Sequence, residues 1–232
     1  MRVNWLSQSL QQVPDDVHWL HPREQEVLEG FKFAKRRNDW LLGRWTAKQC
    51  VEAWLISKDS GVPLNELAII AADDGAPEVF YKDKLLDRII SISHSHGVGL
   101  AAICNRTHIM GCDLEKIETR SPLFIEDYFT DKERSFILGN GEEHTSLLAN
   151  LIWSAKESVV KALRVGLSID TKLIEIHCSP TTNEGEWQHF DIRYPKVDHA
   201  LHGKWQLLSG HVVTIVCDQE QFKPLVIRGN LQ

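Results

Sequence analysis

A short stretch of sequence occurs twice in this chain, and this repetition restricts the folds that the chain can adopt. Trp45–Val51 reads WTAKQCV, and Trp153–Val159, which begins 108 residues later, reads WSAKESV. Each copy lies where apolar residues recur at helical spacing, and β-like runs follow it. The ends of those runs are also alike, at Ala101–Cys104 and Thr214–Cys217. We therefore predict an α+β fold of two pseudo-symmetric halves, each a long helix packed on a small, mostly antiparallel sheet.

The two halves are predicted to be residues 1–108 and 109–232, with no Gly/Ser- or Pro-rich linker between them. Helical spacing and capping residues predict helices at 23–30, 35–58, 131–138 and 142–164. Apolar and β-branched runs between turn residues predict strands at 67–72, 79–81, 89–93, 98–104, 108–114, 168–177, 187–192, 204–208 and 211–217. In both halves, strands therefore follow a long helix.

Composition argues against several classes of protein. Of the 232 residues, 43% are apolar and 25% are charged, which is typical of a globular protein. No run of about 18 apolar residues is present to span a membrane, and the N-terminus lacks the apolar segment of a secretory signal. The five cysteines form no C-x-x-C pair, and the net charge of −6 argues against a uniformly basic nucleic-acid-binding protein. We predict a cytoplasmic protein with no membrane or nucleic-acid partner.

A pair of carboxylates stands at the end of one predicted strand, in Gly111–Glu115. Successive side chains of a strand alternate between its faces, so Asp113 and Glu115 project to the same side. Two convergent carboxylates repel each other, and a hard cation such as Mg²⁺ relieves that repulsion. Gly111 leaves room for a close approach of backbone or ligand. The pattern indicates a metal site, although a solvated strand end has the same spacing.

A third carboxylate lies on the long helix of the second half. Glu157 and Lys161 are one turn apart and share a face of that helix. A surface ion pair has the same spacing, but neighbours such as Trp153 and Val159 are apolar, which favours a helix packed on several sides. A carboxylate in such surroundings needs a partner. We therefore predict that Glu157 is a third metal ligand and that Lys161 meets a phosphate.

A polar strand end in the first half is a candidate anion site. Ser91, Ser93 and Ser95 fall on one face of the predicted strand, with His94 on the opposite face near the turn. A strand end with a histidine in ordinary hydrogen bonds fits the same pattern. The segment contains no G-x-S-x-G, and the chain contains neither a G-x-x-x-x-G-K-[ST] loop nor a dinucleotide-binding glycine fingerprint.

Basic residues mark the long helix of the first half. Lys35–Arg37 opens the helix, and this triplet suits either an anion or a solvated face. Arg44 and Lys48 lie one turn apart beside a tryptophan. Because guanidinium and ammonium groups donate charge-assisted hydrogen bonds to phosphate oxygens, Arg44 and Lys48 are the stronger candidates for holding a polyphosphate.

Three segments, in this order, resemble the signature of a known family: Ser91–Ser95, Gly111–Glu115 and Trp153–Lys161. Together they resemble the 4′-phosphopantetheinyl transferases, over roughly residues 31–217. The length and the internal duplication are similar to the larger, single-chain class named after the surfactin-synthetase activator, and differ from the short trimeric holo-acyl-carrier-protein synthases.

The resemblance implies a reaction and a metal. The 4′-phosphopantetheine group would pass from coenzyme A to a serine of an apo acyl or peptidyl carrier protein, with release of adenosine 3′,5′-bisphosphate. Mg²⁺, or Mn²⁺, would bind Asp113, Glu115 and Glu157. Glu157 would also take the serine proton, directly or through a metal-bound water. The resemblance further implies a monomer with its active site in the cleft between the halves. The first half would grip the nucleotide, and the second would hold the metal and the catalytic helix.

The resemblance also assigns contacts with coenzyme A. Lys161 matches the family's lysine at the diphosphate. Ser93 and His94 match its contacts with the 3′-phosphate, and Arg44 aligns with an arginine that some members place on the nucleotide.

One segment departs from the family pattern. Members usually carry Gly-Lys-Pro where this chain has Gly75 and Ala76 before a proline. The turn is kept but the cation is absent, so nucleotide affinity is expected to rest more on Arg44, Lys48 and Lys35.

The family docks its carrier protein near the segment between the acidic strand and the long helix, which here contains Pro122–Phe129. Its apolar residues either form an exposed docking patch or belong to the core: Phe124, Ile125, Tyr128 and Phe129.

Two other classes stay open. A non-catalytic module that binds coenzyme A or a carrier protein is favoured by the lack of a lysine at Ala76 and disfavoured by the three carboxylates. A metal-dependent nuclease needs a lysine on the strand face of its second acid, whereas Lys116 directly follows Glu115 and points away. The acidic net charge also suits a DNA partner poorly.

Overall fold

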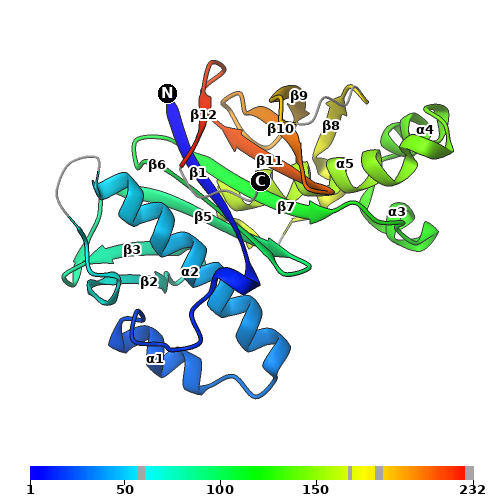
Figure 1. Ribbon diagram of the computed structural model, residues 1–232. Coiled ribbons are helices and arrows are strands. Elements are labelled where there is room, and N and C mark those ends of the chain that lie inside the picture. Colours follow the sequence, from blue (N-terminus) through cyan, green and yellow to red (C-terminus); the bar gives the residue numbers. More distant parts are fainter. Residues whose placement is uncertain (57–60, 167–168, 181–184, 228–232) are drawn as a thin grey trace. The chain divides into compact units, whose positions relative to one another are not determined.

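The computed structural model describes four stretches of the chain: 1–56, 61–166, 169–180 and 185–227. It confirms an α+β fold with mostly antiparallel sheets (Figure 1). The predicted helix end at residue 58 and the predicted strand start at residue 168 lie outside these stretches.

The chain forms two compact units. The first contains Met1–His108 together with the segment that begins at Phe222, and the second contains Ile109–Gln221. The predicted second half, in contrast, was the whole of 109–232. The difference arises because the last described strand pairs with the first strand of the chain, as the register Arg2 to Lys223 shows.

The described part of the first unit contains two sheets. Its helices and strands are β1 (Arg2–Ser9), α1 (Pro22–Glu29), α2 (Ala34–Ile56), β2 (Leu67–Ala71), β3 (Pro77–Tyr81), β4 (Lys84–Leu85), β5 (Arg88–Ser95), β6 (Val98–Asn105) and β12 (Lys223–Val226). Short 3₁₀ helices lie at Leu10–Gln12 and Leu64–Glu66. One sheet has the order β12-β1-β6-β5, and β2, β3 and β4 form the other. β12 runs parallel to β1, and the other described pairings are antiparallel.

The long helix α2 packs on the larger sheet, against β1, β5 and β6 (Figure 1). A Cβ atom added at Gly99 of β6 would lie 2.6 Å from Thr46 Oγ1 of α2, so the glycine permits this close approach. Fully or almost fully buried apolar side chains of helix and strands, among them Leu6, Val51 and Ile103, form the core. β1 has no counterpart among the predicted strands, because most of its residues are buried on both faces and the two-residue alternation is lost.

The second unit has one five-stranded antiparallel sheet in its described residues. Its helices and strands are β7 (Met110–Lys116), α3 (Pro122–Tyr128), α4 (Asp131–Gly139), α5 (Glu142–Leu163), β8 (Glu175–Cys178), β9 (Gln188–Arg193), β10 (His202–Leu208) and β11 (His211–Cys217), with a 3₁₀ helix at Thr171–Leu173. The strand order is β7-β11-β10-β9-β8. α5 packs on β7 and β11 (Figure 1).

Gly111 brings α5 onto β7. A Cβ atom at this position would lie 2.2 Å from the carbonyl oxygen of Ser158 and 2.4 Å from the backbone nitrogen of Ala162, both on α5. Any other residue would push the helix away from the strand. The prediction that Gly111 allows a close backbone approach is confirmed.

Helix ends follow from capping. Thr130 caps α4, because its hydroxyl accepts from Glu133 N at 3.2 Å while the Glu133 carboxylate accepts from Thr130 N at 2.8 Å. α5 ends where Arg164 adopts the left-handed conformation, with φ of 55°. No helix within the described residues has the length and apolar character needed to cross a membrane.

A buried lysine ties the elements of the first unit together. Lys48 of α2 is 0% exposed and forms an ion pair with Glu24 of α1. Its ammonium also donates to the carbonyl oxygens of Trp19 at 2.9 Å and Leu64 at 3.0 Å. The other oxygen of Glu24 accepts from the backbone N–H of Ile69 in β2, at 2.9 Å. One ion pair therefore joins α2, α1 and β2.

The second unit contains the same arrangement. Lys156 of α5 is 0% exposed and lies 2.8 Å from the carboxylate of Glu133 in α4. Its ammonium donates to the carbonyl oxygens of Tyr128 and Thr171, each at 3.0 Å. Glu133 accepts from the backbone N–H of Ile176 in β8, at 2.8 Å.

The two networks correspond residue by residue. In each, the first carbonyl partner lies five residues before the glutamate, and the second lies five residues before the strand residue that donates to that glutamate. Each lysine also stands 5.5 Å from the centre of an aromatic ring, that of Trp19 or Phe129. The repeated sequence thus marks a repeated set of contacts, whereas a symmetry relating the halves stays a prediction.

We expect Lys156→Met to lower the free energy of unfolding by about 3–5 kcal/mol, because it leaves the Glu133 carboxylate buried without its counter-ion. Urea denaturation followed by tryptophan fluorescence measures this loss.

Lys132→Met is the matched control. Lys132 also pairs with a glutamate, Glu175, but its side chain is 67% exposed, and exposed pairs contribute under about 1 kcal/mol. Equal losses in the two variants would show that burial does not set the strength of the Lys156 pair.

Candidate functional site

The two acidic residues of β7 face α5. Asp113 Oδ1 accepts a hydrogen bond from Lys161 Nζ at 2.6 Å, and Glu115 Oε1 accepts one from Trp153 Nε1 at 3.0 Å. Lys161 and Trp153 both lie on α5. Strand alternation therefore places the two carboxylates on one face of β7, as predicted from their spacing.

Glu157 lies within the electrostatic reach of the same group. Burial raises the pKa of its carboxyl, and so does the negative charge of Asp113, whereas Lys161 opposes the rise and Glu115 adds to it. The second unit thus brings together four residues that the sequence analysis singled out: Asp113, Glu115, Glu157 and Lys161.

Lys161 carries the positive charge of this group. Burial disfavours its charged form, but its charge interaction and hydrogen bond with Asp113 outweigh burial, and its pKa is raised. The ammonium therefore stays protonated across neutral pH. Because its side chain is 28% exposed, it remains accessible to a ligand.

Arg120, which was not predicted from the sequence, also contacts this group. Its Nη2 lies 2.8 Å from Glu115 Oε2. Burial and the charge of Asp113 raise the pKa of Glu115, and Arg120 and the Trp153 hydrogen bond oppose that rise. Arg120 follows β7 in a stretch without regular structure, so no periodic spacing connects it with the acidic residues.

The donor chemistry of the group fits a hard divalent cation. Asp113, Glu115 and Glu157 supply carboxylate oxygens, which are the ligands that Mg²⁺ and Mn²⁺ prefer. The negative charge of Asp113 raises the pKa of both glutamates, so an added cation would relieve repulsion. Among the described residues no three side chains are already arranged as a metal cage. Asp113 and Glu115 bond instead to Lys161, Arg120 and Trp153.

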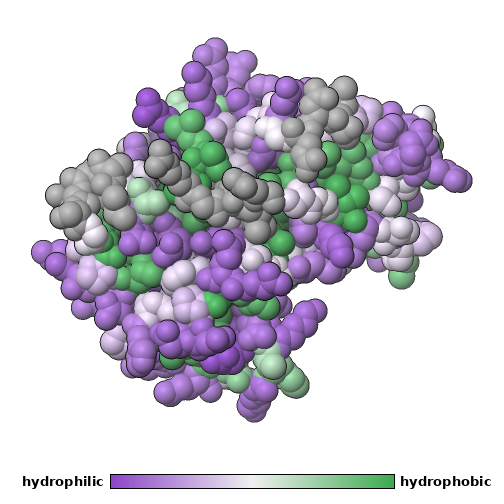
Figure 2. Space-filling model, viewed as in Figure 1, coloured by the Kyte–Doolittle hydropathy of each residue, from purple (hydrophilic) through white to green (hydrophobic). Residues whose placement is uncertain are grey.

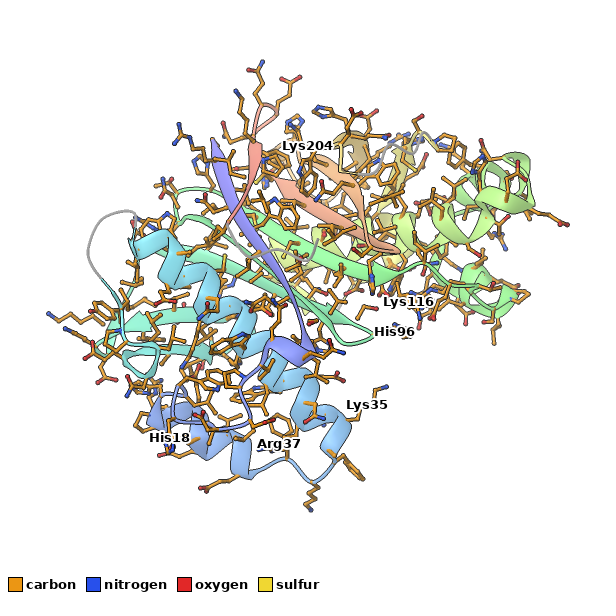
Figure 3. All side chains as sticks on the ribbon, in the orientation of Figure 1. His18, Lys35, Arg37, His96, Lys116 and Lys204 are labelled. Carbon is orange, nitrogen blue, oxygen red and sulfur yellow. The ribbon has the colours of Figure 1, made fainter. Side chains whose placement is uncertain are left out.

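The polar strand end of the first unit has the predicted alternation. Ser91, Ser93 and Ser95 of β5 are buried, and His94 between them is exposed. β5 and β6 join at a tight turn through His96, which has φ of 49° and marks the tip of the hairpin in Figure 3. His94 therefore faces away from the serines.

A cavity of about 490 Å³ lies beside His94. Lys35, at the start of α2, borders it and is exposed (Figure 3). The rings of Phe31 and Trp40 stand 5.6 Å apart, centre to centre, in its wall. The cavity combines cationic and aromatic side chains with a single carboxylate: Lys35, Arg36, His94, Phe31, Phe33, Trp40 and Asp39.

Arg44 lies next to this wall. Its guanidinium carbon stands 5.0 Å from the centre of the Trp40 ring. Burial lowers the pKa of Arg44, and Glu24 opposes the decrease. Its Nε is buried and has no hydrogen-bond partner among the described residues, which leaves a donor for a ligand oxygen.

Lys48 and Gly75 were predicted to belong to the coenzyme A site, but neither lines the cavity beside His94. The ion pair with Glu24 and the two carbonyl oxygens already satisfy the buried ammonium of Lys48, so Lys48 is not available to bind a polyphosphate as predicted. Lys48 lies one helical turn after Arg44, as predicted, but its side chain points into the protein interior. Gly75 is exposed in the turn between β2 and β3, where its φ of 82° requires a glycine.

The segment 122–129 divides between core and surface. Phe129 is 1% exposed and belongs to the core, whereas Tyr128 is 39% and Leu123 is 64% exposed. Phe124 packs against Trp153, with ring centres 5.0 Å apart.

The model of one protein family, described as the 4′-phosphopantetheinyl transferase superfamily, matches residues 109–216. This range contains Asp113, Glu115, Glu157 and Lys161, which together are called the acidic group below. This part of the chain therefore resembles that superfamily. β7 and α5, which carry these residues, therefore lie in the part of the chain that the family model covers.

Curated relatives resemble a larger part of the chain. The L-aminoadipate-semialdehyde dehydrogenase-phosphopantetheinyl transferase of Pongo abelii is 26% identical over 195 residues, which cover 77% of this chain and 61% of the relative. The protein of the same name from Mus musculus has the same identity and coverage. The protein of the same name from Xenopus laevis is 23% identical over 197 residues, which cover 78% of this chain and 64% of the relative. The matched region thus spans about three-fifths of the length of these relatives.

We expect Glu157→Gln to stabilise the protein at pH 8. A carboxyl whose pKa is raised on folding stabilises the folded state below its ordinary pKa, and that contribution is lost as the pH rises through the folded-state value. The glutamine carries no charge to repel Asp113. Urea denaturation at pH 8 and pH 4 should show a gain in the variant at pH 8 that disappears at pH 4.

Glu175→Gln is the control, for which we expect the opposite change in the free energy of unfolding. The hydrogen bond from Lys132 lowers the pKa of Glu175, so its replacement should destabilise the protein at pH 8 and have less effect in acid. A loss of stability in Glu157→Gln at pH 8 would contradict the electrostatic account of the acidic group.

Proposed function

We propose that this protein transfers the 4′-phosphopantetheine group of coenzyme A to a serine of an apo carrier protein, with adenosine 3′,5′-bisphosphate as the second product. One observation carries the proposal. Glu157 of α5 lies in the field of Asp113 and Glu115 of β7 and beside the charge of Lys161, within the residues that match the superfamily. We also propose that it acts as a monomer in the cytoplasm.

Bond changes in this reaction require one proton acceptor and one stabilised leaving group. The carrier serine oxygen forms a bond to the phosphorus next to pantetheine. The bond from that phosphorus to the bridging oxygen breaks, and adenosine 3′,5′-bisphosphate keeps the electron pair. The serine proton passes to the Glu157 carboxylate. A raised pKa makes Glu157 a stronger base than an ordinary carboxylate.

Asp113, Glu115 and Glu157 are the residues that would hold a divalent cation, Mg²⁺ or Mn²⁺. Such a cation, when bound, neutralises negative charge on the diphosphate oxygens. Lys161 adds a positive charge that does not change across neutral pH, because the pKa of its ammonium is raised. Its partial exposure lets it donate to a diphosphate oxygen.

The cavity beside His94 supplies groups suited to the nucleotide. Arg36 and Lys35 are cations for a phosphate, and the rings of Phe31 and Trp40 offer faces for a purine base. Arg44 contributes a buried donor beside Trp40. These contacts would offset the missing cation at position 76. The use of one coenzyme A molecule by residues of both units stays a prediction.

We expect Glu157→Gln to reduce transfer by about 10²–10⁴-fold, which is the usual contribution of a general base. The assay incubates the protein with coenzyme A, Mg²⁺ and a panel of apo carrier domains. Mass spectrometry then detects a gain of one phosphopantetheine unit on the carrier.

Glu175→Gln, a glutamate substitution on β8, should retain full transfer. If the folded wild-type protein modifies no carrier but binds coenzyme A, the alternative of a non-catalytic binding module replaces the enzyme. Full transfer by Glu157→Gln would remove Glu157 from the mechanism.

We expect Arg36→Ala to raise the KM for coenzyme A by about 10–100-fold while kcat changes little. The variant loses a charge-assisted hydrogen bond to phosphate, which contributes about 1.5–3 kcal/mol. None of Asp113, Glu115 and Glu157 lines the cavity, so kcat is expected to change little. Steady-state kinetics with a saturating carrier protein separates the two constants.

Arg37→Ala is the matched control, since Arg37 is the next residue on the same helix and is not among the residues that line the cavity. An equal change in KM for both variants would mean that only the general charge of the helix start matters.

A further inference from the structure

We propose that Arg120 is a positioning residue that holds the carboxylate of Glu115 in place for a divalent cation, an inference that rests on the proposed function. Both oxygens of Glu115 are held. Oε2 accepts from Arg120 Nη2 at 2.8 Å, and Oε1 accepts from Trp153 Nε1 at 3.0 Å. Two donors on opposite oxygens fix the plane of the carboxylate as well as its distance.

Arg120 is itself anchored to α5. Its Nε donates to Asn150 Oδ1 at 2.7 Å. The amide nitrogen of Asn150 donates to the carbonyl oxygens of Glu118 and Ser146, each at 2.7 Å, so the orientation of the side-chain amide is determined. Asn150 is 0% exposed. The guanidinium therefore spans from a rigid helix residue to the carboxylate with two different nitrogen atoms.

Aromatic packing fixes the second donor. The guanidinium carbon of Arg120 stands 5.0 Å from the centre of the Phe124 ring. That ring meets the ring of Trp153 edge to face, with centres 5.0 Å apart. Arg120 and Trp153, which hold the two oxygens of Glu115, are thus held against each other through Phe124.

This arrangement leaves Glu115 able to bind a cation. A carboxylate has about four lone-pair positions on its two oxygens, and the two hydrogen bonds use only two of them. Carboxylates that bind metals are commonly hydrogen-bonded to other groups, which orient them and whose loss weakens metal binding by about 10–100-fold. A fork that reaches both Asn150 and Glu115 is a property of arginine that lysine lacks.

The decisive variant is Arg120→Lys, which keeps the charge and removes the fork. Isothermal titration of the purified protein with Mn²⁺, without coenzyme A, should show a Kd about 10–100-fold higher than that of the wild type. Asn150→Ala, which changes no charge and frees the guanidinium, should weaken Mn²⁺ binding in the same direction. Arg134→Lys, on the surface of α4, should bind Mn²⁺ as the wild type does.

Three outcomes would overturn the proposal. If Arg120→Lys binds Mn²⁺ with wild-type affinity while the wild type modifies carriers, Arg120 is not a positioning residue and the proposed function stands. If Arg120→Gln binds Mn²⁺ more tightly than the wild type, Arg120 acts only as a charge that competes with the metal. If the folded wild type neither binds Mn²⁺ nor modifies a carrier, the proposed function and the role of Arg120 both fail. Circular dichroism of each variant establishes that it is folded.

Discussion

The buried lysine–glutamate pair is the interaction on which the architecture of each unit depends. An ammonium group without exposure to water costs several kcal/mol unless its charge and its donors are all satisfied. Lys156 meets this condition only when three separate segments converge on it. These are the end of α3 at Tyr128, the first turn of α4 at Glu133, and the 3₁₀ helix that begins at Thr171. Glu133 also holds β8 in place, because its carboxylate accepts a hydrogen bond from the backbone N–H of Ile176. The position of α5 on its unit is therefore fixed by hydrogen bonds as well as by apolar packing.

Sequence periodicity identified the acidic group well and the buried lysines poorly. Strand alternation alone places Asp113 and Glu115 on one face, and helical spacing alone places Lys161 one turn after Glu157. The same reasoning put Lys48 near a ligand, because spacing shows which residues share a helix face and not whether that face is exposed. The partner that decides the matter, Glu24, belongs to another helix, and no local pattern connects the two.

Contacts made by irregular segments lie beyond what periodicity can predict. Arg120 reaches Glu115 from a stretch between β7 and α3, and only the folded chain shows which carboxylate it meets. The pairing of β12 with β1 is a contact between the two ends of the described chain. Because of it, the second unit ends at Gln221 and not at residue 232 as predicted. β12 leaves Leu225 and Val226 exposed, and Figure 2 shows hydrophobic side chains gathered over this strand. The four residues of β12 contain no sequence pattern that predicts their pairing with β1.

The duplicated network separates what holds the fold from what performs chemistry. Lys48 and Lys156 make equivalent contacts, but the next residue is Gln49 in the first unit and Glu157 in the second. Adjacent residues on a helix point about 100° apart. A lysine held by an ion pair and two carbonyl oxygens therefore fixes the rotation of its helix, and with it the direction of the following side chain. In the second unit that direction brings Glu157 into the field of Asp113. The buried ion pair of Lys156 and Glu133 thus orients the carboxylate that is proposed to take the proton.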